Sequence, residues 1–272
     1  MNIRYSVQVC DTKSNQKHQR ITNTNKTEIT KRSINSFLKA LLYLDYVKNV
    51  LDDTNLNQTV LFVLDDCSLE VTSFIENIIK RNSCKGLHFE IFYITNGTIR
   101  KSIEKTYDYL LSNDSDLVYQ VQDDYLFYET SILEMIDIFM QVRQSCLTDS
   151  IVSSFNAPSL WTESYKNVST PRMIVPGIKR YWIQTFDITC TFLTSKNQFK
   201  NHVDLYQKFF EVLPHGIDGS LESISLNKIL TERGVLGLLP INSVAFHLQS
   251  NRELDVYQDW KSLWAVSYTH LT

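Results

Sequence analysis

The chain has 272 residues and a mass of 31.7 kDa, enough for one large domain or two small ones. With 43% hydrophobic and 21% charged residues, and few glycines and prolines, its composition excludes disordered and fibrous proteins. A formal net charge of −3 argues against a nucleic-acid partner bound by phosphate neutralisation. The sequence shows no apolar run that could cross a membrane and no secretory signal. Its five cysteines are scattered singly, with no Cys-x-x-Cys spacing. We therefore expect no transmembrane segment and a cytoplasmic location with reduced thiols.

Strands and helices alternate through the first half of the sequence. Residues 5–10 are typical of a strand, and apolar residues then recur at helical spacing over 34–42, with Thr30 as the expected N-cap. Five consecutive apolar residues, Val60–Leu64, predict a strand covered on both faces. The next expected elements are a helix capped by Ser68, a strand at 87–94, a helix at 99–111, a strand at 117–121 and a helix at 132–142. Repeated strand–helix units imply right-handed crossovers and a mainly parallel sheet.

The second half of the sequence is less regular. The expected elements there are a strand at 151–155, a strand pair or one long strand over 183–194, helices at 198–212 and 220–233, and a final strand at 243–248. No linker separates the two halves, so we predict a single α/β domain. The last residues, 267–272, look like a translated adapter read-through, and we expect a non-native tail without function there.

Acidic and polar residues follow three of the early strands. Asp65-Asp66 follows one predicted strand, Thr95-Asn96-Gly97 the next, and Gln122-Asp123-Asp124 the third. Ligands of parallel α/β sheets bind outside the carboxyl ends of the strands, so these groups are expected at one edge. Adjacent carboxylates need a cation or hydrogen bonds to offset their repulsion, and a divalent ion could link them to a diphosphate. Each pair is also explained by ordinary turn and helix-cap chemistry.

Four segments together resemble a known family. The segments 60–68, 121–126, 215–219 and 244–247 resemble, in this order, motifs of the nucleotide-diphospho-sugar glycosyltransferases with the GT-A fold, in particular the inverting family 2 group. The resemblance implies a GT-A-like, Rossmann-like, mainly parallel sheet flanked by helices over residues 1–266. Residues 1–130 would form the nucleotide-binding half, and residues 131–266 the acceptor and catalytic half.

The resemblance also implies an activity and a set of site residues. It implies inverting, metal-dependent transfer of a sugar from a nucleotide-sugar donor, UDP-linked in our expectation, to a glycan or lipid-linked sugar acceptor. Asp124 and His247 would bind Mn²⁺ or Mg²⁺. Asp65 would accept a hydrogen bond from the nucleobase of the donor, with Asp66 in support. The residues expected at the nucleotide are Asp11, Thr12, Asp65, Asp66, Gln122 and Asp123. Gln122 departs from the family pattern, which often has an acidic residue there, so the dependence on metal is open.

An inverting transfer needs a base that takes the proton of the acceptor hydroxyl. Asp218 and Glu222 lie four residues apart, on one face of the helix predicted for 220–233. Asp218 is our first candidate for the base and Glu222 our second. Asp218 is equally suited to be a helix N-cap, and both readings stay open.

Two other functions compete with the transferase. The run Leu64-Asp65-Asp66, followed by Thr95, is similar to haloacid-dehalogenase phosphatases, but Cys67 stands where those enzymes carry their acid. A GT-A-like module that binds a nucleotide or glycan without catalysing transfer is the other alternative. Metal-dependent nucleotide binding with turnover would favour the transferase over both.

Overall fold

The computed structural model describes residues 1–12, 24–50, 56–83, 86–112, 114–158, 161, 171–188, 191–205, 229–248 and 258–267. In chain order, the elements are β1 (Asn2–Val9), α1 (Lys26–Val50), β2 (Asn57–Asp65), α2 (Leu69–Asn82), β3 (Leu87–Ile94), α3 (Ile99–Leu111), β4 (Leu117–Gln122), β5 (Tyr125–Phe127), α4 (Ser131–Cys146), β6 (Ser150–Ser153), β7 (Ile174–Pro176), β8 (Tyr181–Thr185), β9 (Phe192–Ser195), α7 (Lys196–Asn201), β10 (Leu236–Pro240), β11 (Ala245–His247) and α10 (Trp260–Val266).

A nine-stranded sheet forms the centre of the described structure, in the order β3-β2-β1-β4-β9-β6-β10-β8-β7. β3, β2, β1 and β4 pair in parallel, and β6 pairs with β10 in parallel. β9 and β8 pair only antiparallel with their neighbours in the sheet, so they run against the other strands. The prediction of a mainly parallel sheet is confirmed.

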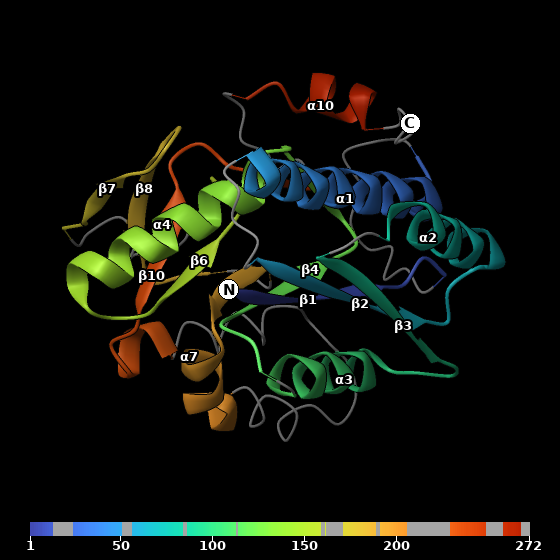
Figure 1. The fold of residues 1–272 in the computed structure, drawn as a ribbon, viewed down its shortest axis with the longest axis horizontal. Coiled ribbons are helices and arrows are strands. Elements are labelled where there is room, and N and C mark those ends of the chain that lie inside the picture. The colour runs from blue at the N-terminus through green and yellow to red at the C-terminus, as the bar shows by residue number, and fades with distance from the viewer. Residues whose placement is uncertain are drawn as a thin grey trace.

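Helices cover both faces of this sheet, as Figure 1 shows. α1, α2 and α4 lie on one face, and α3 and α7 lie on the other. β2 is buried along nearly its whole length, which explains its unbroken apolar sequence. The chain therefore has the single-domain α/β fold that the strand–helix alternation predicts.

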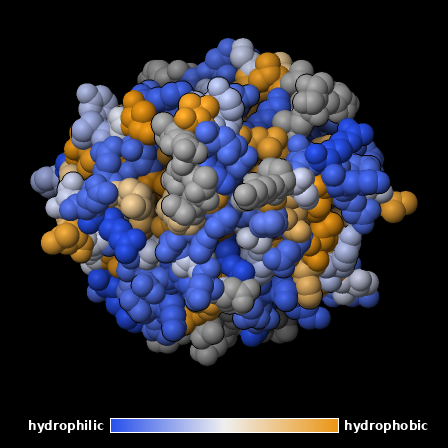
Figure 2. All heavy atoms as spheres, in the orientation of Figure 1, coloured by the Kyte–Doolittle hydropathy of each residue, from blue (hydrophilic) through white to orange (hydrophobic). Residues whose placement is uncertain are grey.

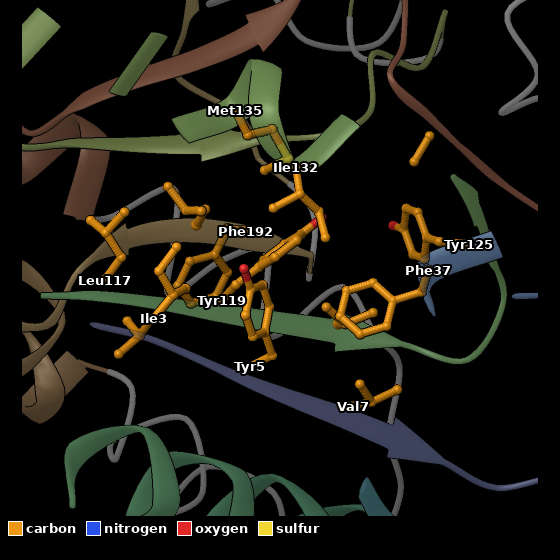
Figure 3. Close-up of a cluster of buried hydrophobic side chains, with 14 of the residues drawn as sticks. Ile3, Tyr5, Val7, Phe37, Leu117, Tyr119, Tyr125, Ile132, Met135 and Phe192 are labelled. Carbon is orange, nitrogen blue, oxygen red and sulfur yellow. The ribbon is translucent and has the colours of Figure 1, made fainter. Parts of the chain in front are cut away.

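Aromatic side chains fill the core between the sheet and the helices α1 and α4 (Figure 3). The ring of Tyr5 on β1 meets Phe37 of α1 edge-on at 5.8 Å between centroids, and Tyr119 of β4 lies 6.0 Å away. The Tyr5 hydroxyl donates to Gln58 Oε1 at 2.9 Å, so its buried polar atom is satisfied. Edge-to-face packing of this kind fixes α1 against the strands that lead to the site.

A second, two-stranded sheet consists of β5 and β11. The sequence predicts no strand between 121 and 132, yet Tyr125–Phe127 pairs with Ala245–His247 in antiparallel register. The final strand expected at 243–248 does exist as β11, but it belongs to this small sheet. Three residues that find their partner more than a hundred positions later leave no local strand pattern.

The start of α1 also differs from its prediction. The expected N-cap, Thr30, is wrong, because the helix begins at Lys26. Asn25 is the cap instead: its Oδ1 accepts from the backbone N–H of Glu28 at 2.8 Å. The first turn of α1 is polar, so the apolar spacing used for the prediction begins too late.

α10 lies beside α1 (Figure 1) and packs against side chains of the small sheet. Ile29, Leu126, Phe246 and Leu248 form a buried cluster against which the tryptophans of α10 pack. Side chains of α1 donate to the last carbonyls of this region: Arg32 to Trp264 O, Asn35 to Ser267 O and Lys39 to Val266 O. Ser267, the first residue of the predicted tail, is thus buried against α1.

The second half departs further from its predicted elements. The region 183–194 holds two separate strands, β8 and β9, which do not pair with each other in the described sheet. The predicted helix at 198–212 is represented by α7 (Lys196–Asn201) and a helical turn at 203–205, and its remainder lies outside the described residues. Of the helix expected at 220–233, the structure describes 229–233, helical over 229–232.

The surface seen in Figure 2 is mostly hydrophilic, with scattered hydrophobic residues. Within the described ranges, no helix is long and apolar enough to cross a membrane.

Candidate functional site

The strands β1, β2, β3 and β4 end at one side of the sheet, which we call the carboxyl edge. The register aligns their ends: Val9 lies opposite Leu64, Gln8 opposite Gln122, and Asp65 opposite Ile94. β1 separates β2 from β4, so the ends of these two strands lie about 10 Å apart. The aspartate pairs that follow β2 and β4 therefore lie at the same edge of the sheet, as predicted.

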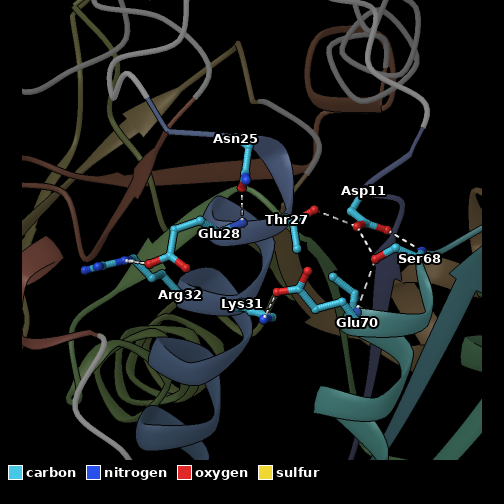
Figure 4. A network of polar contacts seen from close by, with 9 residues as sticks. Asp11, Asn25, Thr27, Glu28, Lys31, Arg32, Ser68 and Glu70 are labelled. Carbon is cyan, nitrogen blue, oxygen red and sulfur yellow. Dashed lines mark hydrogen bonds and ion pairs between the residues drawn. The ribbon is translucent and has the colours of Figure 1, made fainter.

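Asp11, which follows β1, joins three elements (Figure 4). Its carboxylate accepts from the backbone N–H and the hydroxyl of Ser68, at 2.7 and 2.6 Å, and from the Thr27 hydroxyl at 2.9 Å. Ser68 is the N-cap of α2, as predicted, and accepts from the N–H of Val71. The buried Asp11 carboxylate thus fixes the starts of α1 and α2 relative to β1. Thr12 donates its hydroxyl to the backbone carbonyl of Asp66.

The aspartate pair after β2 is tied to the next strand and helix. Asp65 is buried, and its Oδ2 accepts from the Ser102 hydroxyl of α3 at 2.9 Å. Asp66 has a left-handed φ of 48°, and its Oδ1 accepts from the N–H of Asn96 at 2.7 Å. Gly97 packs so tightly here that a Cβ would fall within 3.0 Å of Asp65 Oδ1 and Ile94 Cγ2. A glycine is therefore needed for the close approach of this loop to Asp65.

Asp123, the first acid after β4, is buried and fully engaged. One carboxylate oxygen accepts from Cys10 N and the Thr30 hydroxyl, both at 3.0 Å, and the other contacts Lys26 Nζ at 2.5 Å. Burial raises the pKa of this carboxyl, while Lys26 acts in the opposite direction. These contacts hold the end of β4 against β1 and α1.

Asp124, the second acid after β4, faces a histidine from the end of the chain. Its Oδ2 lies 3.4 Å from His247 Nε2. The pairing of β5 with β11 makes this contact, and the N–H of Leu248 donates to Asp124 O at 2.8 Å. The Tyr125 ring stacks on the imidazole at 4.6 Å and 5°, and Phe155 meets it edge-on at 5.9 Å. Two aromatic rings therefore fix the orientation of the His247 side chain.

The Asp124–His247 pair has the chemistry of two ligands for a divalent ion. Two donor atoms at right angles and about 2.1 Å from one ion lie about 3.0 Å apart, close to the 3.4 Å seen here. The carboxylate oxygen suits both Mn²⁺ and Mg²⁺, whereas the imidazole nitrogen is a borderline donor and favours the transition metal Mn²⁺ over Mg²⁺. No group of three or more His, Cys, Asp or Glu side chains suited to a metal occurs in the described part of the chain. An ion held by these two ligands would take its other ligands from water or phosphate, as Mg²⁺ commonly does.

Cys67 stands beside the carboxyl edge as an unreactive thiol. Its Sγ donates to the Val9 carbonyl at 3.3 Å. Burial, with the nearby Asp11 and Asp123 charges, raises the pKa of the thiol to about 12. A neutral thiol with this pKa is a poor substitute for the acid that a phosphatase of the haloacid-dehalogenase type needs at this position.

The structure places most of the predicted site residues, but not all of them. Gln122 ends β4 in a half-buried position. Asp218 and Glu222, our candidates for the base, lie outside the described residues. The sequence offers Lys26 only as part of a basic stretch that could meet a diphosphate or an anionic acceptor, with solvated charge as the default explanation, and its contact with Asp123 was not predicted. Sequence reasoning also missed Tyr125 and Phe155, for which no local pattern exists.

No protein-family model matches this chain, and no curated protein does. Similar solved structures include the UTP-bound UGPase from Acinetobacter baumannii, with 8% identity, a TM-score of 0.48, and coverage of 98% of this chain and 92% of that one. They also include 4-diphosphocytidyl-2C-methyl-D-erythritol synthase from Anaerococcus prevotii, with 15% identity, a TM-score of 0.39, and coverage of 98% and 95%. A nucleoside-diphosphate-sugar pyrophosphorylase from Vibrio cholerae shows 9% identity, a TM-score of 0.42, and coverage of 97% and 99%. These proteins are named as pyrophosphorylases and a synthase, not as glycosyltransferases, and similarities this distant assign no activity to the chain.

Proposed function

We propose that this chain is an inverting glycosyltransferase that moves a sugar from a nucleotide-sugar donor, UDP-linked in our assignment, to a hydroxyl of a glycan or lipid-linked sugar. The observation that supports this most is the Asp124–His247 pair at the carboxyl edge, where the parallel strands β1, β2 and β4 end. Ligands of parallel α/β sheets bind at this edge.

In this proposal, the residues of the carboxyl edge bind different parts of the donor. Asp124 and His247 would hold Mn²⁺ or Mg²⁺, which would neutralise the charge that develops on the departing diphosphate. Asp65 would accept a hydrogen bond from the nucleobase, and Asp66 and Gly97 would hold its loop. Gln122 would face the ribose. Asp11, Thr12 and Asp123 would support the nucleotide from behind, since the contacts of all three include neighbouring elements of the chain.

The reaction forms a bond between the acceptor oxygen and the anomeric carbon and breaks the bond from that carbon to the diphosphate. The acceptor hydroxyl gives its proton to a catalytic base. We assign this role to Asp218, with Glu222 as the second candidate. These two residues lie outside the described part of the chain, so their role is proposed from the sequence alone.

The test measures binding and turnover separately. Calorimetry with UDP, with and without Mn²⁺, should show tighter binding when the ion is present, because the two ligands of the chain need the diphosphate to complete the coordination. A panel of nucleotide-sugars is then scored for UDP release with simple sugar acceptors. Asp124→Ala should remove the metal dependence of UDP binding and lower turnover by about 10²–10³-fold.

Asp116→Ala is the matched control, because it removes a carboxylate from the opposite end of β4, where Asp116 accepts from Asn2 N. This variant should bind UDP and Mn²⁺ as the wild type does. Normal metal-dependent binding by Asp124→Ala would overturn the metal assignment. Binding without turnover would favour a non-catalytic module. Release of pyrophosphate from UTP and a sugar phosphate, or of phosphate from small phosphoesters, would replace the glycosyltransferase by another enzyme.

A further inference from the structure

The strand that carries His247 is too short to hold its own position. β11 has three residues and forms a two-stranded sheet with β5. A pairing of this size is marginally stable unless other parts of the chain support it. The register that brings His247 opposite Tyr125 must therefore be fixed partly from outside the small sheet.

One support comes from the residues that follow β6. The N–H groups of Val244 and Ala245 both donate to the Ser154 carbonyl, at 2.9 and 3.0 Å. Ser154 directly precedes Phe155, whose ring meets the imidazole of His247 edge-on. The donors at the start of β11 and one wall of the imidazole are thus fixed by the same piece of chain.

The second support is the guanidinium of Arg180, which stands directly before β8. Its Nη1 donates to the carbonyls of Asn242 and Ser243, both at 2.8 Å, just ahead of β11. Its Nε and Nη2 contact the two carboxylate oxygens of Glu134 at 2.5 and 3.2 Å. Glu134 lies in the first turn of α4. One side chain therefore joins α4 to the segment that leads into β11.

This arrangement uses the shape of the guanidinium as well as its charge. The Glu134 side chain is 1% exposed and that of Arg180 15%, so the pair is shielded from water. The Thr130 hydroxyl donates to the same carboxylate at 2.5 Å, which restricts its rotation. A planar fork with several fixed donors can bind a carboxylate and two carbonyls together, whereas a lysine offers one compact charge.

We propose that Arg180 is a positioning residue for His247: its guanidinium holds the chain ahead of β11 where the imidazole meets Asp124. The importance of Arg180 for turnover rests on the proposed function, because it requires a metal ion at the Asp124–His247 pair. The positioning itself is a property of the free protein and is measured without metal or nucleotide.

The first experiment follows the imidazole of His247 by NMR. The stacked Tyr125 ring shifts the Cε1–H signal, which a His247→Gln variant identifies. Glu134→Met with Arg180→Met removes both charges together, so no buried charge is left unpaired and the fold should be kept. In this double variant the signal should move toward that of an unstacked imidazole, and the β11 amides should exchange faster with solvent. Signals are compared at the alkaline limit of the titration, where a changed charge state cannot imitate a changed orientation.

Two further variants separate the fork from the charge and from α4. Arg180→Lys keeps a positive charge near Glu134 but loses the fork, so the His247 signal should move in this variant as well. Arg143→Met with Asp149→Asn is the matched control. It removes an ion pair of 3.3 Å from the other end of α4 and should leave the signal unchanged.

The second experiment connects this position to the metal site. Loss of a group that orients a metal ligand weakens metal binding by about 10–100-fold, so Arg180→Lys should weaken Mn²⁺-dependent binding of UDP by at least about 10-fold. UDP binding without the ion should not change. If the wild-type chain shows no metal-dependent UDP binding, the proposed function fails, while the NMR signal still tests the position of His247.

Three results would contradict the role of Arg180. An unchanged His247 signal in Arg180→Lys would leave Arg180 with an effect on stability alone, since lower stability does not move a signal of the folded protein. A signal that moves equally in the Arg143 control would show that any change in α4 reaches His247. A displaced signal with unchanged Mn²⁺-dependent UDP binding would separate Arg180 from the metal site. Should the double methionine variant fail to fold, Arg180→Lys decides among these outcomes.

Discussion

The two aspartate pairs at the carboxyl edge offset the repulsion between neighbouring carboxylates in different ways. After β4, a lysine meets the first acid, because Lys26 contacts Asp123 at 2.5 Å. After β2, neutral groups donate to both acids: the Ser102 hydroxyl to Asp65 and the Asn96 N–H to Asp66. The β4 pair also separates its roles clearly, since Asp123 holds the fold together while Asp124 faces His247. Because Asp123 takes part in this internal compensation, its loss should lower the free energy of unfolding more than a change at the β2 pair.

The largest effect is expected from Asp123→Ala. It leaves the Lys26 ammonium without its carboxylate, together with Cys10 N and the Thr30 hydroxyl. Removing one partner of a buried ion pair costs about 3–5 kcal/mol of unfolding free energy, which urea denaturation would measure. Asp116→Ala, at the exposed end of the same strand, should cost about 1 kcal/mol or less. A loss below about 1 kcal/mol for Asp123→Ala would show that Lys26 finds other partners.

Asp124→Ala sharpens the comparison within the β4 pair. Under the proposed function, it lowers turnover by about 10²–10³-fold, yet it should change the unfolding free energy by only about 1 kcal/mol. Its contact with His247, at 3.4 Å, is long and partly exposed to solvent. A strongly destabilised Asp124→Ala protein would mean that both acids of this pair are structural.

Gly97→Ala tests the β2 pair. The added methyl group would press on the Asp65 carboxylate and on Ile94, and overpacking of this kind costs about 1–3 kcal/mol. In the proposed function, UDP binding should weaken as well, because Asp65 moves. Gly234→Ala serves as a control, since space around Gly234 is open, although its φ of 67° adds strain of its own. Unchanged stability and UDP affinity in Gly97→Ala would remove Asp65 from the nucleotide site.

The smallest effect concerns the thiol between the two pairs. With a pKa of about 12, Cys67 stays protonated at pH 8–9, so iodoacetamide should modify the exposed Cys146 long before Cys67. Alkylation of Cys67 should become faster only as the pH approaches this pKa. Mass spectrometry of digested protein after timed labelling would give both rates. Equal rates at neutral pH would show that neither burial nor the nearby carboxylates raise the pKa of this thiol.

The sequence predicts the parallel half of the fold well, because its strands carry their own signal. The run Val60–Leu64 is buried on both faces, and Ser68 caps the helix that follows. Parallel pairing then brings Asp65 and Asp123 to one edge without further information. β5 could not be predicted, because three residues become a strand only through pairing with β11.

The site was predictable where one residue type carries the chemistry, and not where geometry does. Asp124 and His247 could be proposed only through the resemblance of their segments to motifs of a known family. The stacking of Tyr125 and the edge contact of Phe155 depend on how β5, β11 and the segment after β6 pack together. Lys26 resembled any surface lysine until the position of α1 was known.

The pairing of β5 with β11 has a consequence for how the protein is made. Phe127 meets Ala245, and the histidine of the site follows two residues later. Domains generally begin to fold from the N-terminal side during synthesis. A ribosome will therefore have released most of the sheet before the strand that completes the site emerges. A product truncated ahead of β11 would keep the parallel half of the sheet and lack His247, and any activity that depends on this histidine would begin only after synthesis has passed residue 247.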